Sequence, residues 1–272
     1  MSTPEDNDQP IFDDKWLKNA RTMNSNASWA NAVVESLETS GQKYLATFRL
    51  WFNEFPAPPN DKQKLRERLE CFQNNQHLGG VNELAWWIFM QRENLMATVV
   101  PTTKKASRPD FQLKPPADCF IEITTLNISV KDRQALNHDE TIRRVIGKLT
   151  DEKLKQLMYA ADQKKSGVLV IFDYSEWSAF GTNFFNALGE FLLGTKFGFK
   201  DVLPELSAII YMERKVDDGR IKLSGARSAV YYNPLACYPL LVNCFPLLNQ
   251  FRYPLASSER SSTEPWIYLC KP

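Results

Sequence analysis

Histidine is scarce in this sequence: His77 and His138 are the only two among 272 residues. A zinc centre with several histidine ligands, or a serine–histidine–aspartate triad, needs histidine at defined places in the fold. The sequence therefore argues against these sites, and catalysis would have to depend on carboxylates and lysines.

The sequence also lacks paired cysteine motifs and long apolar runs. Its five cysteines include no C-x-x-C spacing, and "MSTPEDNDQP" at the start is acidic and has no apolar core of a signal peptide. We expect a reducing, cytoplasmic location. The longest apolar run, 239–248, is interrupted by Asn243 and Pro246 and is too short for a bilayer, so we expect no membrane partner.

The chain has enough apolar residues for a large core, with a hydrophobic content of 43%. Its net charge of +1 neither requires nor excludes nucleic acid, because a basic groove can be balanced by acidic residues elsewhere. Patterning predicts a disordered start and a helical extension over 1–75, followed by one core domain over 76–272.

Periodicity predicts an α/β fold, a mixed sheet with helices on both sides. Helices are expected in the extension at 13–23, 28–55 and 61–73, the last capped by Asp61, and in the core at 79–95, 138–164 and 184–193. Strands are expected at 97–101, 109–113, 119–126, 167–174, 206–214 and 229–233.

Two carboxylates occupy the expected hairpin at "PDFQLKPPADCFIEITTL". If the turn is centred near Pro116, residues whose numbers sum to 232 are opposite each other, and Asp110 meets Glu122. Such a pair suits Mg²⁺ or Mn²⁺, which prefer oxygen ligands. A solvated hairpin face that carries two incidental acids is the alternative.

Glu83 is a third carboxylate with unusual surroundings. It stands in the first turn expected for helix 79–95, and its neighbours at helical spacing, Trp86, Trp87 and Met90, are large and apolar. A buried carboxylate needs a partner. A favourable interaction with the helix dipole explains the same residue without a functional site.

Lys153 and Gln156 fall on the apolar stripe of the expected helix 138–164, together with residues such as Leu157 and Ala160. Lys148 lies on the opposite side. A lysine on a core-facing stripe is costly unless an anion receives it. The alternative is a lysine that snorkels to solvent at the helix edge.

These residues together resemble the PD-(D/E)XK nuclease superfamily, which has the restriction-endonuclease-like fold. The resemblance covers about residues 76–175, and four motifs carry it: Glu83, Pro109-Asp110, Glu122-Ile123-Thr124 and Lys153-x-x-Gln156. Thr124 stands where the family has its lysine. Divergent members move that lysine to the neighbouring helix, where Lys153 is the first candidate and Lys148 the second.

The resemblance implies metal-dependent hydrolysis of phosphodiester bonds, with DNA favoured and RNA left open. Asp110, Glu122 and the carbonyl of Ile123 would bind Mg²⁺ or Mn²⁺, with Glu83 completing or orienting the shell. Lys153 would hold the water or the phosphate, and Gln156 would orient a carboxylate or the phosphate.

Two other interpretations remain open at this stage. The first is a catalytically silent nuclease-like domain that binds nucleic acid or a protein, which the threonine at position 124 favours. The second is a helical interaction protein, in which the N-terminal helices and the apolar stretch near the C-terminus form a homodimer or partner surface.

Overall fold

The protein is described here from a computed structural model. The structure describes residues 10–22, 42–101, 107–126, 147, 153–173, 203–217, 220–223, 228–254, 259 and 267–270. The chain forms two compact units, Met1–Phe89 with Asp217–Ile221, and Met90–Val216 with Lys222–Pro272.

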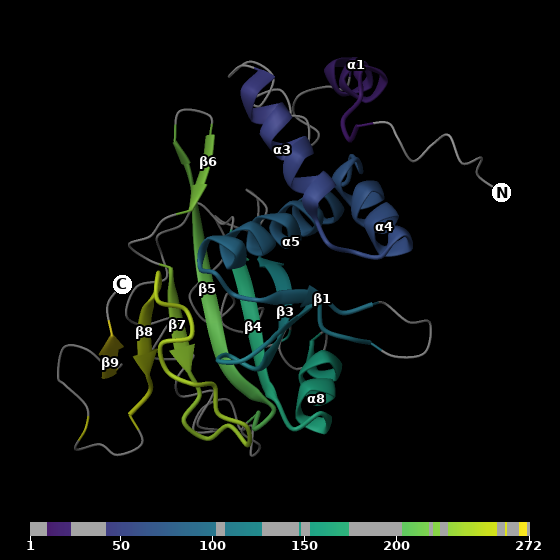
Figure 1. The fold of residues 1–272 in the computed structure, drawn as a ribbon. Helices are drawn as coiled ribbons and strands as arrows, with labels where there is room; N and C mark the ends of the chain where they lie inside the picture. Colours follow the sequence, from purple (N-terminus) through teal and green to yellow (C-terminus); the bar gives the residue numbers. More distant parts are fainter. Residues whose placement is uncertain are drawn as a thin grey trace. The chain divides into compact units, whose positions relative to one another are not determined.

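The first unit is helical. Its described helices are α1 (Asp14–Thr22), α3 (Gln42–Glu54), α4 (Pro59–Leu69) and most of α5 (Asn74–Arg92) (Figure 1). Helix α4 begins at Pro59, so Asp61 lies in its first turn and not at the cap; proline in the first turn needs no N–H partner. The predicted Asp61 cap is therefore wrong.

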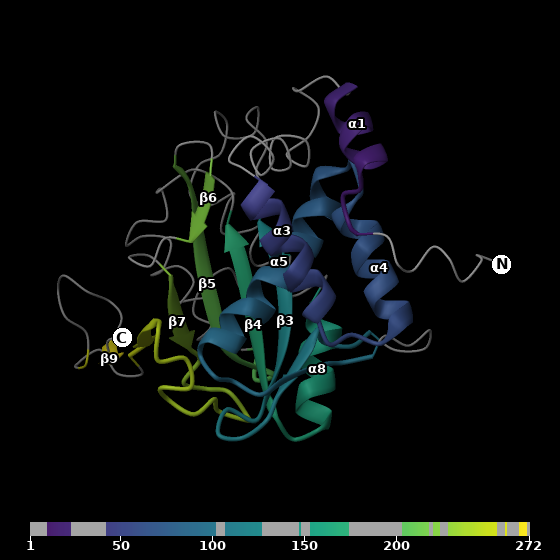
Figure 2. The same ribbon diagram turned by 45° about the horizontal axis from the view of Figure 1, so that its top comes forward.

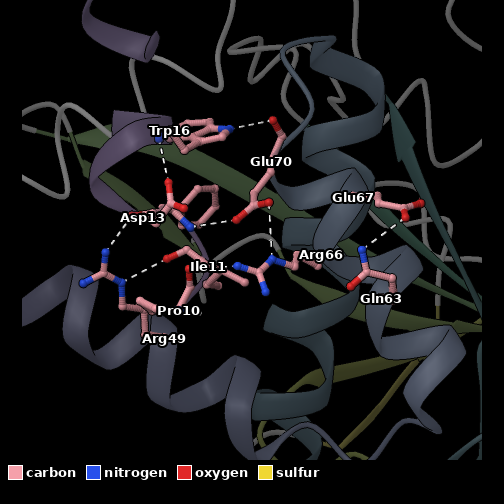
Figure 3. Close-up of polar contacts among 10 residues, drawn as sticks. Pro10, Ile11, Asp13, Trp16, Arg49, Gln63, Arg66, Glu67 and Glu70 are labelled. Carbon is pink, nitrogen blue, oxygen red and sulfur yellow. Dashed lines mark hydrogen bonds and ion pairs between the residues drawn. The ribbon is translucent and has the colours of Figure 1, made fainter. Parts of the chain in front are cut away.

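The segment before α1 is held on the first unit by buried side chains and by hydrogen bonds to its backbone (Figure 3). Ile11 and Phe12 are 1% and 0% exposed. Arg49 donates to the carbonyls of both residues at 3.0 and 2.6 Å, and Glu70 accepts the Phe12 N–H at 2.9 Å. The described helical extension therefore begins in a fixed segment at Pro10.

The second unit contains a mixed β-sheet, as the patterning predicted. Its described strands are β1 (Ala97–Val99), β2 (Phe111–Leu113), β3 (Cys119–Leu126), β4 (Ser166–Asp173), β5 (Leu206–Asp217), β6 (Arg220–Leu223), β7 (Ala229–Tyr232), β8 (Asn249–Arg252) and β9 (Ile267–Cys270). They are ordered β1-β2-β3-β4-β5-β7-β8-β9, with β6 pairing to β5. The pairs β3–β4, β4–β5 and β7–β8 are parallel, and the other pairs on this path are antiparallel.

The central strand β4 is buried because both of its faces are apolar. Residues 168–172 of β4 are all at most 2% exposed, in keeping with their continuous run of Val, Leu, Ile and Phe. Helix α8 (Leu154–Asp162) packs beside β3 and β4, and both ribbon views show it there (Figures 1 and 2).

The register of the β2–β3 hairpin is the one that the sequence predicts. Phe111 is opposite Ile121 and Gln112 is opposite Phe120, so paired residue numbers sum to 232. The turn includes Pro115 and Pro116, and the Asp118 N–H donates to the Lys114 carbonyl at 3.4 Å.

Strands β6, β8 and β9, each 4 residues long, were not expected. Helix α5 begins five residues before its predicted start. The expected helix 184–193, and most of 138–152, lie outside the described residues. No helix among those the structure describes is long and apolar enough to cross a membrane.

Candidate active site

Asp110 is fixed at the start of β2 by its backbone and by its side chain. Its carbonyl accepts the Val100 N–H at 3.0 Å, which extends the pairing with β1. Its carboxylate Oδ2 accepts the Ile123 N–H of β3 at 2.8 Å. The observed pairing with β3 begins at Phe111 opposite Ile121, and Asp110, one residue before it, contacts β3 through this side-chain hydrogen bond. The expected position of Asp110 directly opposite Glu122 stays a prediction.

Glu122 is 4% exposed and forms an ion pair with Lys153, whose Nζ lies 2.5 Å from Glu122 Oε1. The Lys153 side chain is itself only 20% exposed. A buried carboxylate is costly unless it is paired, and this ammonium supplies the charge and the hydrogen bond. The alternative interpretation, in which the Lys153 side chain extends into solvent at the helix edge, is therefore wrong.

Packing of α8 on β3 brings Lys153 to Glu122. Phe120 forms an edge-to-face contact with Tyr159 at 5.3 Å between ring centroids, and it clusters with Ala160. Side chains two residues apart on a strand point to the same face, so Glu122 lies on the face that α8 covers. Buried Leu157 and Ala160 anchor the helix there, as their place on the apolar stripe predicts.

Lys153 differs from the expectation in its local structure. It is the residue immediately before α8, with φ −109° and ψ −5°, and not a residue in the interior of one continuous helix. The Gln156 N–H donates to the Lys153 carbonyl at 3.2 Å. Gln156 thus lies in the first turn of α8, close to Lys153 in sequence and partly buried.

Thr124 is 6% exposed and lies two residues after Glu122 on β3, so it shares the same face. A lysine at this position would have to bury its stem next to Glu122. Lys148 lies outside the described residues, and its assignment as the second candidate lysine stays a prediction.

Glu83 belongs to the first unit, whereas Asp110, Glu122 and Lys153 belong to the second. It is 7% exposed and forms an ion pair with Arg68 of α4. Since α5 begins at Asn74, Glu83 lies more than two turns inside the helix, and the proposed dipole interaction of the first turn is wrong. Its place near the other carboxylates stays a prediction.

The donor atoms at the hairpin fit a hard divalent cation in their chemistry. Asp110, Glu122 and the carbonyl of Ile123 would supply oxygen atoms, and Mg²⁺ often takes one or two carboxylates and fills its shell with water. No group of three or more His, Cys, Asp or Glu that could hold a metal occurs in the described part of the chain. Any ion at the hairpin would therefore rely on two carboxylates there.

Arg108 and Tyr159 adjoin this site, although the sequence analysis did not single them out. The Arg108 guanidinium lies over the Tyr159 ring, 5.5 Å from its centroid. The only sequence signal was the position of Arg108 directly before Pro109-Asp110. Its contact with α8 depends on helix packing, which one sequence does not reveal.

Comparisons of the chain with protein-family models, with curated proteins and with solved structures found no match.

Proposed function

We propose that the protein is a metal-dependent nuclease with a restriction-endonuclease-like core, a divergent member of the PD-(D/E)XK superfamily. The observation that carries this proposal is the contact between Lys153 and Glu122. It unites an acidic hairpin residue with an ammonium group from the next described helix, which is the arrangement expected when the family's strand lysine has moved.

In the proposed reaction a bound Mg²⁺ or Mn²⁺ would activate water and stabilise charge on the phosphate. Asp110 and Glu122 would hold the ion, and the hydrogen bond from the Ile123 N–H orients Asp110 for this role. Lys153 would leave Glu122 Oε1 and bind the attacking water or the phosphate. Gln156, at the start of α8, would orient one of these groups.

A catalytically silent binding domain is the second candidate. The specific observation that favours it is the same ion pair, because a lysine that neutralises Glu122 also has a purely structural use. The two functions differ in whether a phosphodiester bond is cut.

The test is incubation of the purified protein with supercoiled plasmid, linear single-stranded DNA and RNA, each in Mg²⁺, Mn²⁺ or EDTA. We expect metal-dependent cleavage of DNA that Asp110→Ala and Lys153→Ala abolish. Lys155→Ala is the matched control, because Lys155 is exposed two residues further along α8. Failure of the wild-type protein to cut any substrate in either metal would favour the silent domain.

A further inference from the structure

Arg108 occupies a defined place beside the proposed site. Its guanidinium lies over the Tyr159 ring of α8, and the same ring contacts Phe120 of β3. Phe120 is two residues before Glu122 on one face of the strand. The cationic group is therefore held on the face of the sheet that carries Glu122 and is covered by α8.

Arg108 Nε is shielded from solvent and has no hydrogen-bond partner in the described part of the chain. A buried donor without a partner is unfavourable, and the cation–π contact offsets only part of that cost. Arg108 thus retains its hydrogen-bonding capacity at the edge of the site.

Four other described arginines form hydrogen bonds or ion pairs within the protein. Arg49 donates to backbone carbonyls, and Arg66, Arg68 and Arg252 form ion pairs with glutamates. Each of these has an internal acceptor that explains its position. Arg108 lies instead over an aromatic ring, which orients the plane of the guanidinium. Its terminal NH₂ groups, unlike the shielded Nε, are the donors available to an external anion.

We infer that Arg108 binds a backbone phosphate of nucleic acid next to the bond that Asp110, Glu122 and Lys153 act on. This inference rests on the proposed function. A planar guanidinium matches two phosphate oxygens, and its terminal NH₂ groups supply the charge-assisted bonds. Tyr159 is the positioning residue that holds the guanidinium in place.

The experiment measures binding of a fluorescent DNA duplex by anisotropy in EDTA, where no metal supports cleavage, over a series of salt concentrations. Arg108→Gln should weaken binding about tenfold and reduce the slope of log K against log salt by about 1, as the loss of one phosphate contact does. The affinity of Arg108→Lys should lie between those of wild type and Arg108→Gln, because lysine keeps the charge but lacks the planar guanidinium.

Lys155→Gln is the matched control: it removes the same charge from the exposed side of α8 and should change the affinity less than twofold. Tyr159→Phe keeps the ring and should bind like wild type, whereas Tyr159→Leu should reproduce part of the Arg108→Gln loss. If Arg108→Gln is too unstable to measure, Arg108→Lys and Tyr159→Leu provide the same comparison.

Two outcomes overturn the inference in distinguishable ways. If the wild type cuts DNA but Arg108→Gln binds DNA with the same affinity as Lys155→Gln, Arg108 does not bind a phosphate and the proposed function stands. If the wild type neither binds nor cuts nucleic acid, the proposed function and the phosphate contact fall together.

Discussion

The contact between Lys153 and Glu122 should stabilise the folded protein, apart from any role in catalysis. Lys153→Met removes the ammonium and leaves a carboxylate that is 4% exposed without that counter-charge. We expect a loss of about 3 kcal/mol in the free energy of unfolding, measured in urea near pH 7.

Glu122→Gln in the Lys153→Met background tests the cause of that loss. The double variant should be more stable than Lys153→Met, because a neutral amide replaces the buried charge. Equal stability of the single and double variants would mean that the ion pair contributes little.

Glu93 is a buried carboxyl in the second unit, 9% exposed, whose Oε1 accepts the Leu247 N–H at 3.2 Å. Burial raises its pKa from 4.5 to about 7, and the hydrogen bond opposes this effect only in part. A carboxyl whose pKa is higher in the folded state than in the unfolded state adds to the free energy of unfolding. This contribution is full at pH values below the unfolded-state pKa, and it is lost as the pH rises to the folded-state pKa. The contribution of Glu93 to stability should therefore fall between pH 4.5 and 7.

Glu93→Gln should remove that part of the pH dependence, because the amide does not ionise and can still accept the bond from Leu247. The stability of this variant relative to wild type should improve between pH 5 and pH 8, by up to about 3 kcal/mol. Glu54→Gln, at an exposed position in α3, is the control in the same urea titrations. Parallel pH profiles for wild type and Glu93→Gln would contradict the expectation.

Among the elements, the loop between β7 and β8 is held by one buried side chain. Gln250, which is 0% exposed, accepts bonds from the Tyr232 hydroxyl at 2.6 Å and the Asn243 N–H at 2.7 Å. It also donates to Asn243 Oδ1 at 3.0 Å and to the Phe245 carbonyl at 3.1 Å. Gln250 thus joins β7 and β8 to the loop between them through four hydrogen bonds.

Gln250→Leu should lower the free energy of unfolding by about 3 kcal/mol, since buried polar groups on the loop lose this partner and each costs about 1 kcal/mol or more. The measurement is urea unfolding followed by circular dichroism. Asn249→Ala is the control, because the contact of Asn249 with the exposed Tyr268 is long, at 3.5 Å. Similar losses in both variants would show that Gln250 does not hold the loop.

For the whole molecule, the proposed metal site implies a ligand-dependent melting temperature. A cation at one hundred times its Kd stabilises the folded state by about 2.7 kcal/mol, which for a chain of this size raises Tm by about 5 °C. We expect this shift with Mg²⁺ or Mn²⁺ and not with sodium chloride at the same ionic strength. Asp110→Ala should abolish it, and a wild-type Tm that does not respond to either metal would contradict metal binding at the hairpin.

The sequence by itself determined the local features that depend on neighbours along the chain. Alternating and β-branched runs predicted β3, β4 and β5. The Pro-Pro turn predicted the register of the β2–β3 hairpin, in which the numbers of paired residues sum to 232. Burial of Leu157 and Ala160 followed from helical spacing. These features need no knowledge of distant residues, because backbone geometry fixes which side chains share a face.

Only the tertiary structure decided which side chains from distant parts of the sequence contact each other. The ion pair of Lys153 with Glu122 spans 31 residues and depends on how α8 packs on β3. The placing of Arg108 over Tyr159 depends on the same packing. Short strands β8 and β9 exist because neighbouring strands complete their hydrogen bonds, and their own residues carry too little pattern to predict them. Contacts between distant residues depend on the whole packed chain, so they appear only when the elements are assembled.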